Sequence, residues 1–538
     1  MAVGAAGIGC RAMHESDHRH PAVVAGVVVS VSPPASTVGG DVLSRGGNAV
    51  DAAVATAFAL AVTWPEAGNI GGGGFMLVAE PGDDPICIDY REIAPAAASQ
   101  DMYQPGEDRH TPRHVAVPGT VAGLFLAHET YGTLPWDDVL TPAVALAREG
   151  FIVDTFLARS LNEVLADDPP AELVRLYGKP GGGTWESGDR LALPELAETL
   201  ELIAEQGPAG FYQGVTAQRL ATFMAETDGI ITEDDLVAYE AKSRPATVAS
   251  FRGHEVWGAP LPSSGGICVG LALQLLEPFD LRRGDPGTLH LVAESLRRAF
   301  HYRALYLGDA DFAAAPPMPN ELPIDPDVAT PSESLSPPVE ITPEPPSTTH
   351  FSVLDADGMA VANTYTLEQS WGSRQIAPGT GFVLNNEMGD FNWTPGRTTR
   401  GGAIGTAANL IEPGKRPLSS QSPTIVKREG DVVIVTGSPG GRTIISTVVG
   451  VIVNRLALGM TPQESVAAPR LHHGWLPDLL RIEAGLGDQA DALRLLGHDV
   501  EVVERQGSAQ SIFVVDGAAV GVPDTRRGGL AVTAKAVR

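Results

Sequence analysis

The feature that most constrains this chain is a proline-rich segment that ends abruptly at a pair of predicted strands. Eleven of the 35 residues from 313 to 347 are proline, and apolar residues are few. Such a composition favours extended or irregular backbone over a packed core. An alternating strand with Phe351 and Val353, an Asp-Ala-Asp-Gly turn at 355–358 and a second strand ending at Thr366 then follow. The chain therefore enters a buried sheet directly from a segment that has little to bury.

Thr348 opens this pair of strands, and its position suits a residue that becomes a new N-terminus by cleavage. An N-terminal Thr carries a hydroxyl nucleophile and an α-amine on one residue. The α-amine has a pKa near about 8, so it can accept the hydroxyl proton at neutral pH. Two plainer interpretations also fit the segment, an ordinary hairpin after a loop and a linker between independent domains. The strand that begins at once after the tail favours cleavage over a linker.

Two glycine clusters indicate places where the backbone lies against other backbone or against a ligand. Four glycines at 71–74 enter a predicted strand. A phosphate-binding loop is excluded there, because no Gly-Lys-Ser/Thr follows and a strand rather than a helix comes next. Gly440 and Gly441 lie between a strand at 432–435 and an apolar helix predicted over 443–458. Their amides can bind a developing oxyanion at a helix start, and a simple strand-to-helix turn would explain the same glycines.

The first half of the chain reads as mixed α and β structure, with elements that begin and end at recognisable caps and turns. The predicted elements are a short helix capped by Ser36 and Thr37 that ends at Gly46-Gly47, a helix over 49–62 capped by Asn48, a strand over 86–90 that ends at Arg91, and a helical, charged region over 190–245. The Ala-Pro-Leu-Pro-Ser-Ser-Gly-Gly segment at 259–266 predicts a rigid turn.

Composition excludes several classes of function. The chain has 538 residues, 43% of them hydrophobic, and a net charge of -28. Such an acidic surface would repel nucleic acid and anionic membranes, so neither is expected as a partner. The apolar runs are too short or too interrupted to span a bilayer. The three cysteines match no zinc or redox spacing, and the adjacent His472 and His473 diverge and lack a spaced third ligand. We therefore expect no metal, no cofactor and no structural disulfide.

The N-terminal 20 residues contain several charged and histidine side chains but no basic region followed by an apolar one. A secretory signal peptide would require that order. As written, the chain is therefore expected in the cytoplasm, and a mis-assigned start codon would leave a periplasmic or extracellular location open.

A series of short motifs runs in a fixed order from about Ser30 to Thr525. They are Gly-Gly-Asn-Ala-Val-Asp-Ala-Ala at 46–53, Gly-Gly-Gly-Gly-Phe-Met-Leu at 71–77, Asp-Tyr-Arg-Glu at 89–92, Pro-Ser-Ser-Gly-Gly at 262–266, Thr-Thr-His at 348–350, Leu-Asn-Asn at 384–386, Arg-Pro-Leu-Ser-Ser at 416–420, Gly-Ser-Pro-Gly-Gly at 437–441 and His-His-Gly-Trp-Leu-Pro at 472–477. Several of them are weak alone. Together and in this order, they resemble the γ-glutamyltransferase (γ-glutamyltranspeptidase, glutathione hydrolase) family of N-terminal-nucleophile hydrolases.

The resemblance implies a fold of the α/β (α+β) class, a four-layer αββα sandwich made as one precursor and cut before Thr348. The first product would be a large subunit, residues 1–347, which begins with a poorly predicted segment, 1–29, and ends in the proline-rich tail, 313–347. The second would be a small catalytic subunit, residues 348–538. The two products would stay interlocked as a heterodimer.

The resemblance also implies which residues perform the chemistry. Thr348 would be the nucleophile, first in self-cleavage of the zymogen and then in attack on a γ-glutamyl amide. Thr366 would hydrogen-bond near it. Gly440 and Gly441 would form the oxyanion hole.

The implied donor site combines a cation with two acids. Arg91, with Ser419 and Ser420, would bind the α-carboxylate of the donor, and a planar Arg fork suits that group. Glu387 and Asp390 would bind its α-ammonium. An Arg on one side and two acids on the other would recognise the zwitterionic head of an amino acid, which supports a γ-glutamyl donor on chemical grounds alone.

Two places depart from the pattern of the family. Glu368 stands where well-studied members have an Asn that touches the α-carboxylate. A carboxylate there would repel the donor unless it is protonated, turned away or paired with Arg91. The lid-loop segment at 395–402 lacks the aromatic residue that often shields the site.

We predict a γ-glutamyl hydrolase and acyltransferase that acts on glutathione-like donors, with water, amino acids or peptides as acceptors. The alternative is an amidohydrolase or acylase of the same mechanism with a different acyl group, such as a glutaryl- or cephalosporin-acylase-like enzyme. Glu368 and the changed lid motivate that alternative. A non-catalytic scaffold fits poorly, because every proposed catalytic position holds a competent residue.

Overall fold

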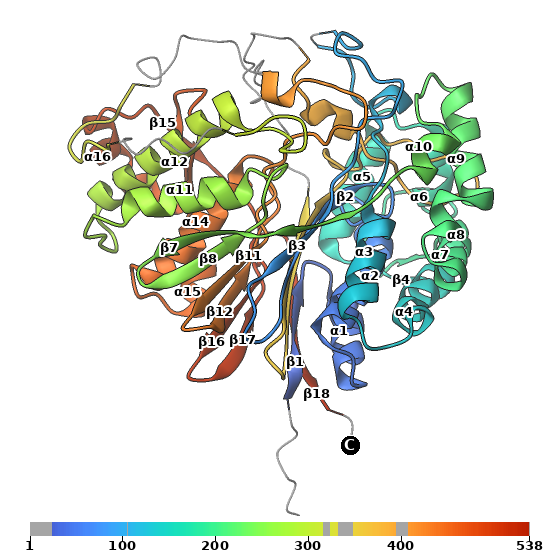
Figure 1. The fold of residues 1–538 in the computed structure, drawn as a ribbon, viewed down its shortest axis with the longest axis horizontal. Helices are drawn as coiled ribbons and strands as arrows, with labels where there is room; N and C mark the ends of the chain where they lie inside the picture. The colour runs from blue at the N-terminus through green and yellow to red at the C-terminus, as the bar shows by residue number, and fades with distance from the viewer. Residues whose placement is uncertain (1–23, 105, 316–322, 332–347, 394–406, 537–538) are drawn as a thin grey trace, which may run out of the picture.

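The computed structural model describes residues 24–104, 106–315, 323–331, 348–393 and 407–536. Two antiparallel sheets lie face to face, and helices cover the outer face of each, so the chain forms four layers in the order αββα (Figure 1). The fold class predicted from the sequence is therefore confirmed. The predicted lid segment, most of the proline-rich tail and most of the N-terminal segment lie outside the described residues.

The first sheet has seven strands, and segments from both ends of the chain alternate in it. Its order is β18 (Leu530–Lys535), β1 (Val24–Ser30), β9 (Thr349–Asp355), β10 (Ala360–Thr366), β2 (Gly73–Ala79), β3 (Ile86–Tyr90) and β6 (Lys242–Pro245). The hairpin formed by β9 and β10 thus occupies the centre of the sheet, between β1 and β2. The strand, turn and strand predicted after the proline-rich tail are confirmed.

The second sheet has six strands and packs against the first. Its order is β17 (Ala518–Val522), β16 (Ser511–Val515), β12 (Asp431–Thr436), β11 (Thr424–Arg428), β8 (His254–Gly258) and β7 (Thr247–Phe251). Small apolar side chains fill the space between the sheets, among them Val29, Ala362 and Val435. Because side chains alternate along a strand, neighbours such as Val28 and Val361 face the helices instead.

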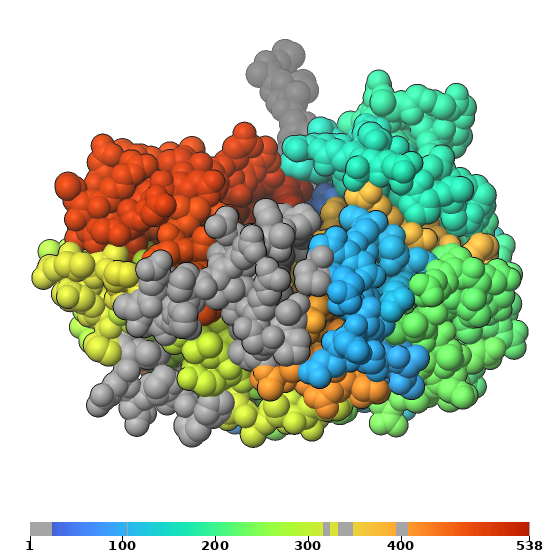
Figure 2. All heavy atoms as spheres, turned by 90° about the horizontal axis from the view of Figure 1, so that it is seen from above, coloured from blue at the N-terminus to red at the C-terminus, as the bar shows by residue number. Residues whose placement is uncertain are grey.

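Helices form the two outer layers, one on each side of the paired sheets (Figure 1). Those of the first half are α1 (Pro33–Ser44), α2 (Ala49–Thr63), α3 (Thr120–Tyr131), α4 (Trp136–Glu149), α5 (Thr155–Ala166), α6 (Ala171–Tyr177), α7 (Pro194–Gln206), α8 (Ala209–Tyr212), α9 (Gly214–Glu226) and α10 (Glu233–Val237). Those beside the second sheet are α11 (Gly265–Leu276), α12 (Pro286–Tyr306), α14 (Thr443–Leu456), α15 (Pro462–Ala467) and α16 (Ala490–Leu495). Seen from above, these two groups lie on opposite sides of the molecule (Figure 2).

Two small sheets complete the described structure. They are β13 (Leu471–His473), β14 (Leu480–Glu483) and β15 (Val500–Val503), and the pair β4 (Phe151–Ile152) and β5 (Arg190–Leu191). None of the described helices is both long and apolar enough to cross a membrane.

The predicted helix starts are partly right. Asn48 caps α2 as expected, because its side chain accepts hydrogen bonds from the amides of Val50 and Asp51. The prediction for α1 was wrong, because this helix begins at Pro33 and Ser36 lies inside it. The Ser36 hydroxyl instead donates to the carbonyl of Leu530, so it joins the helix to the first sheet. A proline at the first helical position is itself a start signal, and it lies three residues before the Ser that the sequence analysis chose.

The four glycines at 71–74 pack backbone against backbone. A Cβ added to Gly72 would lie 2.1 Å from the carbonyl oxygen of Thr366, and one added to Gly74 would lie 2.4 Å from that of Thr364. These approaches allow β2 to lie beside β10 and end next to Thr366. Of the two explanations that the sequence allowed, packed backbone is the one that the structure supports.

Candidate active site

A small cavity of about 50 Å³ lies where β9 begins and where β10 and β12 end. The residues that line it are Arg91, Arg303, Thr348, Thr366, Glu368, Glu387, Asp390, Ser419, Ser420, Gln421, Gly441 and Ile444. Nine of the ten residues proposed from the sequence are therefore brought together from segments as distant as 91 and 441. The tenth, Gly440, shares a turn with Gly441 and lines a groove on the other side of that turn.

The two threonines meet because β9 and β10 are antiparallel. Thr349 pairs with Tyr365 in the register of the two strands, which brings Thr348 opposite Thr366. The Oγ1 atom of Thr348 donates a hydrogen bond of 3.3 Å to Oγ1 of Thr366. The Thr366 oxygen also accepts a bond of 2.9 Å from the amide of Glu368. The nucleophile proposed from the sequence is thus buried, and its hydroxyl is held by a partner on the adjacent strand.

The turn that follows β12 carries two amides that point to no acceptor among the described residues. Gly440 and Gly441 have φ angles of +132° and +53°, which favour glycine over residues with a side chain. Within the described part of the chain, neither N–H group donates a hydrogen bond, whereas both carbonyls accept bonds from the first turn of α14. Two undonated amides at a helix start have the chemistry of an oxyanion hole.

Arg91 is fully buried and lies at the centre of an ionic cluster. Its two Nη atoms lie 2.5 Å from a carboxylate oxygen of Glu387 and 2.5 Å from one of Asp390. Its Nε donates to the carbonyl of Pro417 at 3.1 Å, and Glu92 lies 3.4 Å away. Burial alone would lower the pKa of Arg91, but these carboxylates raise it above its usual value, so the guanidinium stays charged.

Two carboxyl groups of this cluster, those of Glu92 and Glu387, hold protons more tightly than usual. Burial raises the pKa of Glu92 to about 7, against the lowering effect of Arg91. Burial also raises the pKa of Glu387 well above its usual value, and Arg91 again opposes the shift. One guanidinium faces three carboxyls, and partial protonation near neutral pH brings the cluster closer to charge balance. The sequence predicted the cation and the acids on opposite sides of the site, whereas in the structure Arg91 pairs directly with them.

Glu368 is neutralised by a residue that the sequence analysis did not consider. Its Oε1 lies 2.9 Å from Nη1 of Arg109, and its side chain is only 7% exposed. Of the three arrangements proposed for this carboxylate, pairing is present, but the partner is Arg109 instead of Arg91. The backbone of Glu368 has a φ of +78°, a conformation that non-glycine residues seldom adopt. The loop after β10 therefore holds this side chain in a particular direction.

The motif at 262–266 positions the two serines of the cavity. The amide of Ser264 donates to the carbonyl of Ser419 at 2.8 Å, and the Ser264 hydroxyl donates to the same oxygen at 2.6 Å. The amide of Ser419 in turn donates to the carbonyl of Pro262. The hydroxyl of Ser420 makes no hydrogen bond with any described residue, so it is available to a ligand in the cavity. The rigid turn predicted here is a clamp for the loop that carries Ser419 and Ser420.

Arg303 lines the cavity and was not predicted from the sequence. Its side chain is 8% exposed, and its Nε donates to the Ser264 hydroxyl at 2.8 Å. A weak signal was present in α12, since Leu296, Ala299 and Arg303 share one face of the helix and the first two are fully buried. An Arg that replaces a core residue on an apolar face indicates a charged site, but α12 contains other arginines that obscure it. Gln421 and Ile444, which also line the cavity, carry no comparable signal.

The neighbouring histidines have packing roles. His472 bonds to the Ser446 hydroxyl at 2.7 Å, and His473 lies 3.3 Å from a carboxylate oxygen of Asp478. Burial lowers the pKa of His473 to about 4 and that of His472 well below its usual value, so both are neutral near pH 7. Nowhere in the described ranges do three or more His, Cys, Asp or Glu side chains form a group that could bind a metal ion.

Comparison with known proteins identifies the family and the fold. The sequence profile described as gamma-glutamyltranspeptidase matches residues 35–534. The chain is 43% identical over 540 residues to the glutathione hydrolase proenzyme of Escherichia coli (strain K12), which covers 95% of this chain and 92% of that protein. The fold is similar to that of cephalosporin acylase from Bacillus halodurans, with a TM-score of 0.82 at 25% identity over 95% of this chain and 96% of that one. It is also similar to gamma-glutamyltranspeptidase of Helicobacter pylori, with a TM-score of 0.51 at 37% identity over 53% of this chain and 84% of that one.

Proposed function

The chain belongs to the gamma-glutamyltranspeptidase family and is an enzyme of the glutathione hydrolase and γ-glutamyltransferase type, and we propose which of its residues perform this activity. One observation carries the proposal. The Thr348 hydroxyl, bonded to Thr366, lies in the same small cavity as the Arg91 cluster, beside a turn with two undonated amides. A nucleophile, an oxyanion site and a charged pocket for an amino-acid head are the three parts that γ-glutamyl transfer requires.

In the precursor, Thr348 cuts its own chain. Its Oγ attacks the carbonyl carbon of Ser347, and the C–N bond of that peptide breaks as the nitrogen of Thr348 takes up the proton. This shift leaves an ester on Thr348 Oγ and frees the α-amine of Thr348. Water then cleaves the ester, which releases the carboxyl of Ser347 and restores the Thr348 hydroxyl. The E. coli relative is named a proenzyme, which supports a precursor here as well.

In the mature enzyme, Thr348 Oγ attacks the γ-carbonyl carbon of the donor while its proton passes to the α-amine. The amides of Gly440 and Gly441 stabilise the oxyanion that forms. The C–N bond of the donor then breaks, and the leaving amine takes the proton from the α-ammonium. Water or the amine of an acceptor attacks the γ-glutamyl ester in the same way, which regenerates the Thr348 hydroxyl.

The charged head of the donor binds by replacing two ion-pair contacts within the cluster around Arg91. The α-carboxylate takes the place of an acid beside Arg91, with Ser419 and Ser420 donating to it. The α-ammonium takes the place of the Arg91 guanidinium beside Glu387 and Asp390. Every buried charge keeps an opposite partner, so binding leaves none uncompensated.

The two cleavage products are proposed to remain one interlocked unit, residues 1–347 and 348–538. The strand order of the first sheet supports this, because β9 and β10 from the second product lie between β1 and β2 from the first. Separating the products would break backbone ladders on both sides of that hairpin.

The alternative of an acylase with another acyl group has one structural argument, the cephalosporin acylase fold. Its main chemical motive was the repulsion between Glu368 and a donor carboxylate. The Arg109–Glu368 pair removes much of that repulsion, and the family match favours a γ-glutamyl donor.

The two functions are separated by turnover of two chromogenic substrates. A γ-glutamyl anilide and a glutaryl anilide differ only by the α-amino group that Glu387 and Asp390 are proposed to bind. We expect the γ-glutamyl anilide to be cleaved with the higher kcat/KM. A glutaryl anilide that is cleaved equally well or better would favour the acylase. Glutathione-like donors, amino-acid or peptide acceptors and a cytoplasmic location stay predictions.

A further inference from the structure

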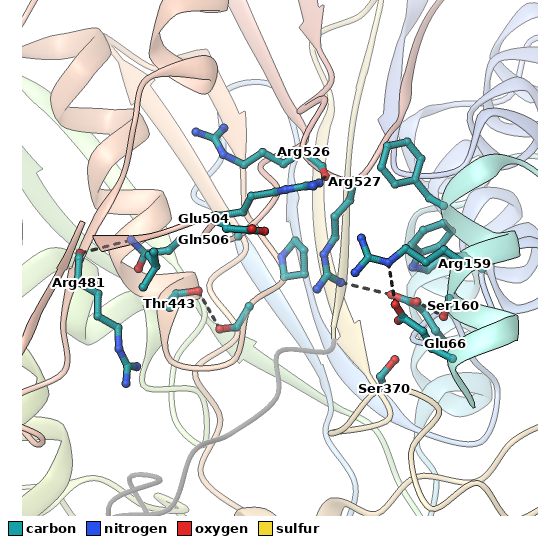
Figure 3. A pocket seen from close by; sticks show the side chains of 18 of the residues that line it. Glu66, Arg159, Ser160, Ser370, Thr443, Arg481, Glu504, Gln506, Arg526 and Arg527 are labelled. Carbon is teal, nitrogen blue, oxygen red and sulfur yellow. Dashed lines mark hydrogen bonds and ion pairs between the residues drawn. The ribbon is translucent and has the colours of Figure 1, made fainter. Parts of the chain in front are cut away.

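The arginines of the groove that Gly440 lines are compensated by the protein itself. This groove, of about 670 Å³, lies between α5 on one side and the first turn of α14 with β14 and β15 on the other (Figure 3). Four of its five arginines pair with a carboxylate, as Arg527 does with Glu66 at 3.3 Å (Figure 3). The fifth, Arg505, is exposed to water.

Arg303 in the neighbouring cavity is different, because it is buried without a counter-ion. Six arginines in the described part of the chain are buried, and the five that form an ion pair with a carboxylate are Arg91, Arg297, Arg298, Arg416 and Arg470. Arg303 is the sixth, and no described Asp or Glu side chain pairs with it. Buried charges in proteins are almost always paired, since an isolated one is costly. The counter-ion of Arg303 is therefore expected to come from a ligand.

The side chains around Arg303 also have polar groups to offer. Its Nε donates to the Ser264 hydroxyl at 2.8 Å, whereas its two Nη groups donate to no described residue. Gln421, which also lines the cavity, is 2% exposed, and neither polar atom of its side chain has a hydrogen-bond partner among the described residues. The hydroxyl of Ser420 is uncommitted as well. This part of the cavity lining is therefore rich in donors that lack an acceptor.

The α-carboxylate of the donor is the anion that fits this position. The Ser264 hydroxyl joins Arg303 to the loop of Ser419 and Ser420, because it also donates to the Ser419 carbonyl at 2.6 Å. These two serines are the proposed donors to the α-carboxylate, and a cavity of about 50 Å³ leaves little space between its lining groups. Of the two arginines that line it, Arg91 already contacts two acids, so Arg303 is the uncommitted cation.

We propose that Arg303 is a second cation for the α-carboxylate of the donor. It contacts this group from the side of Ser420, while Arg91 contacts it from the side of the acids. Arg303 thereby makes the enzyme select donors with a free α-carboxylate. This inference rests on the proposed function, since it takes Thr348 as the nucleophile and the cavity as the site of the γ-glutamyl head.

The first test compares two donors in the parent enzyme and in Arg303→Gln. One is a γ-glutamyl anilide, and the other is the same anilide with its α-carboxylate converted to a carboxamide. Arg303→Gln should lower kcat/KM about tenfold to a hundredfold for the carboxylate donor, the size of a buried charge-assisted contact, and less than about threefold for the carboxamide donor. Arg303→Lys should lose less, because it keeps the charge. Equal losses for the two donors would overturn the proposal.

A second variant separates direct contact from an effect transmitted through Ser264. Ser264→Ala removes the hydroxyl that links Arg303 to the Ser419 loop, while the amide of residue 264 can still donate to the Ser419 carbonyl. The ratio of kcat/KM for the two donors should stay within about twofold of the parent value. A ratio that falls as far as in Arg303→Gln would show that Arg303 only positions the loop, and the proposed contact would be wrong.

Arg298→Gln is the matched control for a loss of stability. Arg298 lies on the same helix, α12, is 4% exposed and pairs with Glu294, and it does not line the cavity. Its replacement should lower the melting temperature and leave the ratio of the two donors unchanged. All rates are referred to the self-cleaved fraction of each protein, which denaturing gels measure.

The outcomes separate this inference from the proposed function. A parent enzyme that hydrolyses the γ-glutamyl anilide, together with equal losses for both donors in Arg303→Gln, would overturn the role of Arg303 and leave the function intact. Absence of γ-glutamyl anilide hydrolysis by the self-cleaved parent enzyme would instead overturn the proposed function itself.

Discussion

The cavity lined by Gly441 and the groove lined by Gly440 lie on two sides of the same turn, and their ion pairs differ in burial. In the cavity of about 50 Å³, Arg91 and Glu387 are fully buried and in contact. In the groove of about 670 Å³, two pairs are exposed: Arg159 with Glu163, whose side chains are 68% and 63% exposed, and Arg481 with Glu501, at 40% and 48%. Buried ions depend strongly on each partner, whereas exposed pairs contribute about 0–1 kcal/mol and exchange partners readily.

This difference predicts strict selection on one side of the scissile bond and tolerance on the other. A ligand in the cavity must replace the buried charges it displaces, so a head without an ammonium or a carboxylate leaves an uncompensated ion. A ligand in the groove exchanges weak contacts and has room for side chains of different size. The enzyme is therefore expected to be strict for the γ-glutamyl head and permissive for the group attached to it.

The largest effect is expected from the proposed nucleophile, Thr348, because self-cleavage and turnover both depend on its hydroxyl. Thr348→Ala should remove self-cleavage and turnover together, so the purified protein should remain a single 56.2 kDa chain on denaturing gels. Thr349→Ala should be at most slowed, since its side chain does not reach the cavity lining. N-terminal sequencing of the smaller fragment of the parent is the deciding measurement. A start at any residue other than Thr348 would contradict the assignment.

Variants of Arg91 test how strictly the cavity selects the γ-glutamyl head. Arg91→Ala should lower kcat/KM for the γ-glutamyl anilide on the order of 10²-fold or more. Arg91→Lys should also be impaired, because it keeps the charge but loses the planar fork. Self-cleavage should continue in both, since the scissile peptide is not a γ-glutamyl amide.

Arg91 also stabilises the fold, and the measurement must distinguish this role from substrate binding. Arg91→Ala leaves Glu92, Glu387 and Asp390 without their cation, so a loss of stability on the order of 3–5 kcal/mol is expected. Thermal melting of each variant distinguishes this loss from a loss of substrate binding. Unchanged anilide hydrolysis in a folded Arg91→Ala protein would show that the donor head is bound elsewhere, and the acylase would become the better hypothesis.

The Arg109–Glu368 pair should have a smaller effect that depends on both residues. Arg109→Ala exposes the donor carboxylate to a Glu368 that has lost its Arg109 partner, so kcat/KM for the γ-glutamyl anilide should fall about fivefold. Glu368→Asn should leave processing intact and turnover unchanged or improved. The double variant should recover the activity lost by Arg109→Ala. Additive effects in this double-mutant cycle would show that the pair does not neutralise Glu368 in the way proposed.

The smallest effect on catalysis is expected from Glu92, whose buried carboxyl belongs to the ionic cluster around Arg91. Burial raises the pKa of Glu92 from 4.5 to about 7, so between these values the unfolded chain releases a proton that the folded chain keeps. The free energy of unfolding should therefore fall as pH rises through this window and level off above it. Glu92→Gln should remove this component of the fall, which urea unfolding at pH 5 and pH 7.5 can measure. An unchanged difference between the two pH values would contradict the raised pKa.

Much of the site could be predicted from the sequence because its signals are local. The proline-rich tail, Thr348 and the strands after it are contiguous, and so are Gly440, Gly441 and the helix that follows them. The predicted elements then formed largely as expected, including the capped start of α2. The start of α1 was missed even though Pro33 marked it, because two favourable cap residues, Ser36 and Thr37, lie just beyond.

The choice of charge partners could not be predicted in this way. Arg109 and Glu368 are 259 residues apart, and Arg91 and Asp390 are 299 apart. No local pattern in the sequence indicates which residues so far apart in the chain come into contact. The sequence predicted that Arg91 and the acids share a site, but not that they contact one another, and it did not indicate that Arg109 would neutralise Glu368.

The sequence by itself identified the family through its ordered motifs and, through that resemblance, the four-layer fold. It also placed the proposed nucleophile and the proposed oxyanion turn on contiguous segments, because turn and cap chemistry acts within a few residues. Only the tertiary structure decided which ions pair, which carboxyls hold protons near neutral pH, and that a groove built from residues 64 to 527 lies beside the cavity. Ion pairing and pKa depend on burial and on distances between side chains from remote segments. Those quantities exist only after the two sheets have packed together.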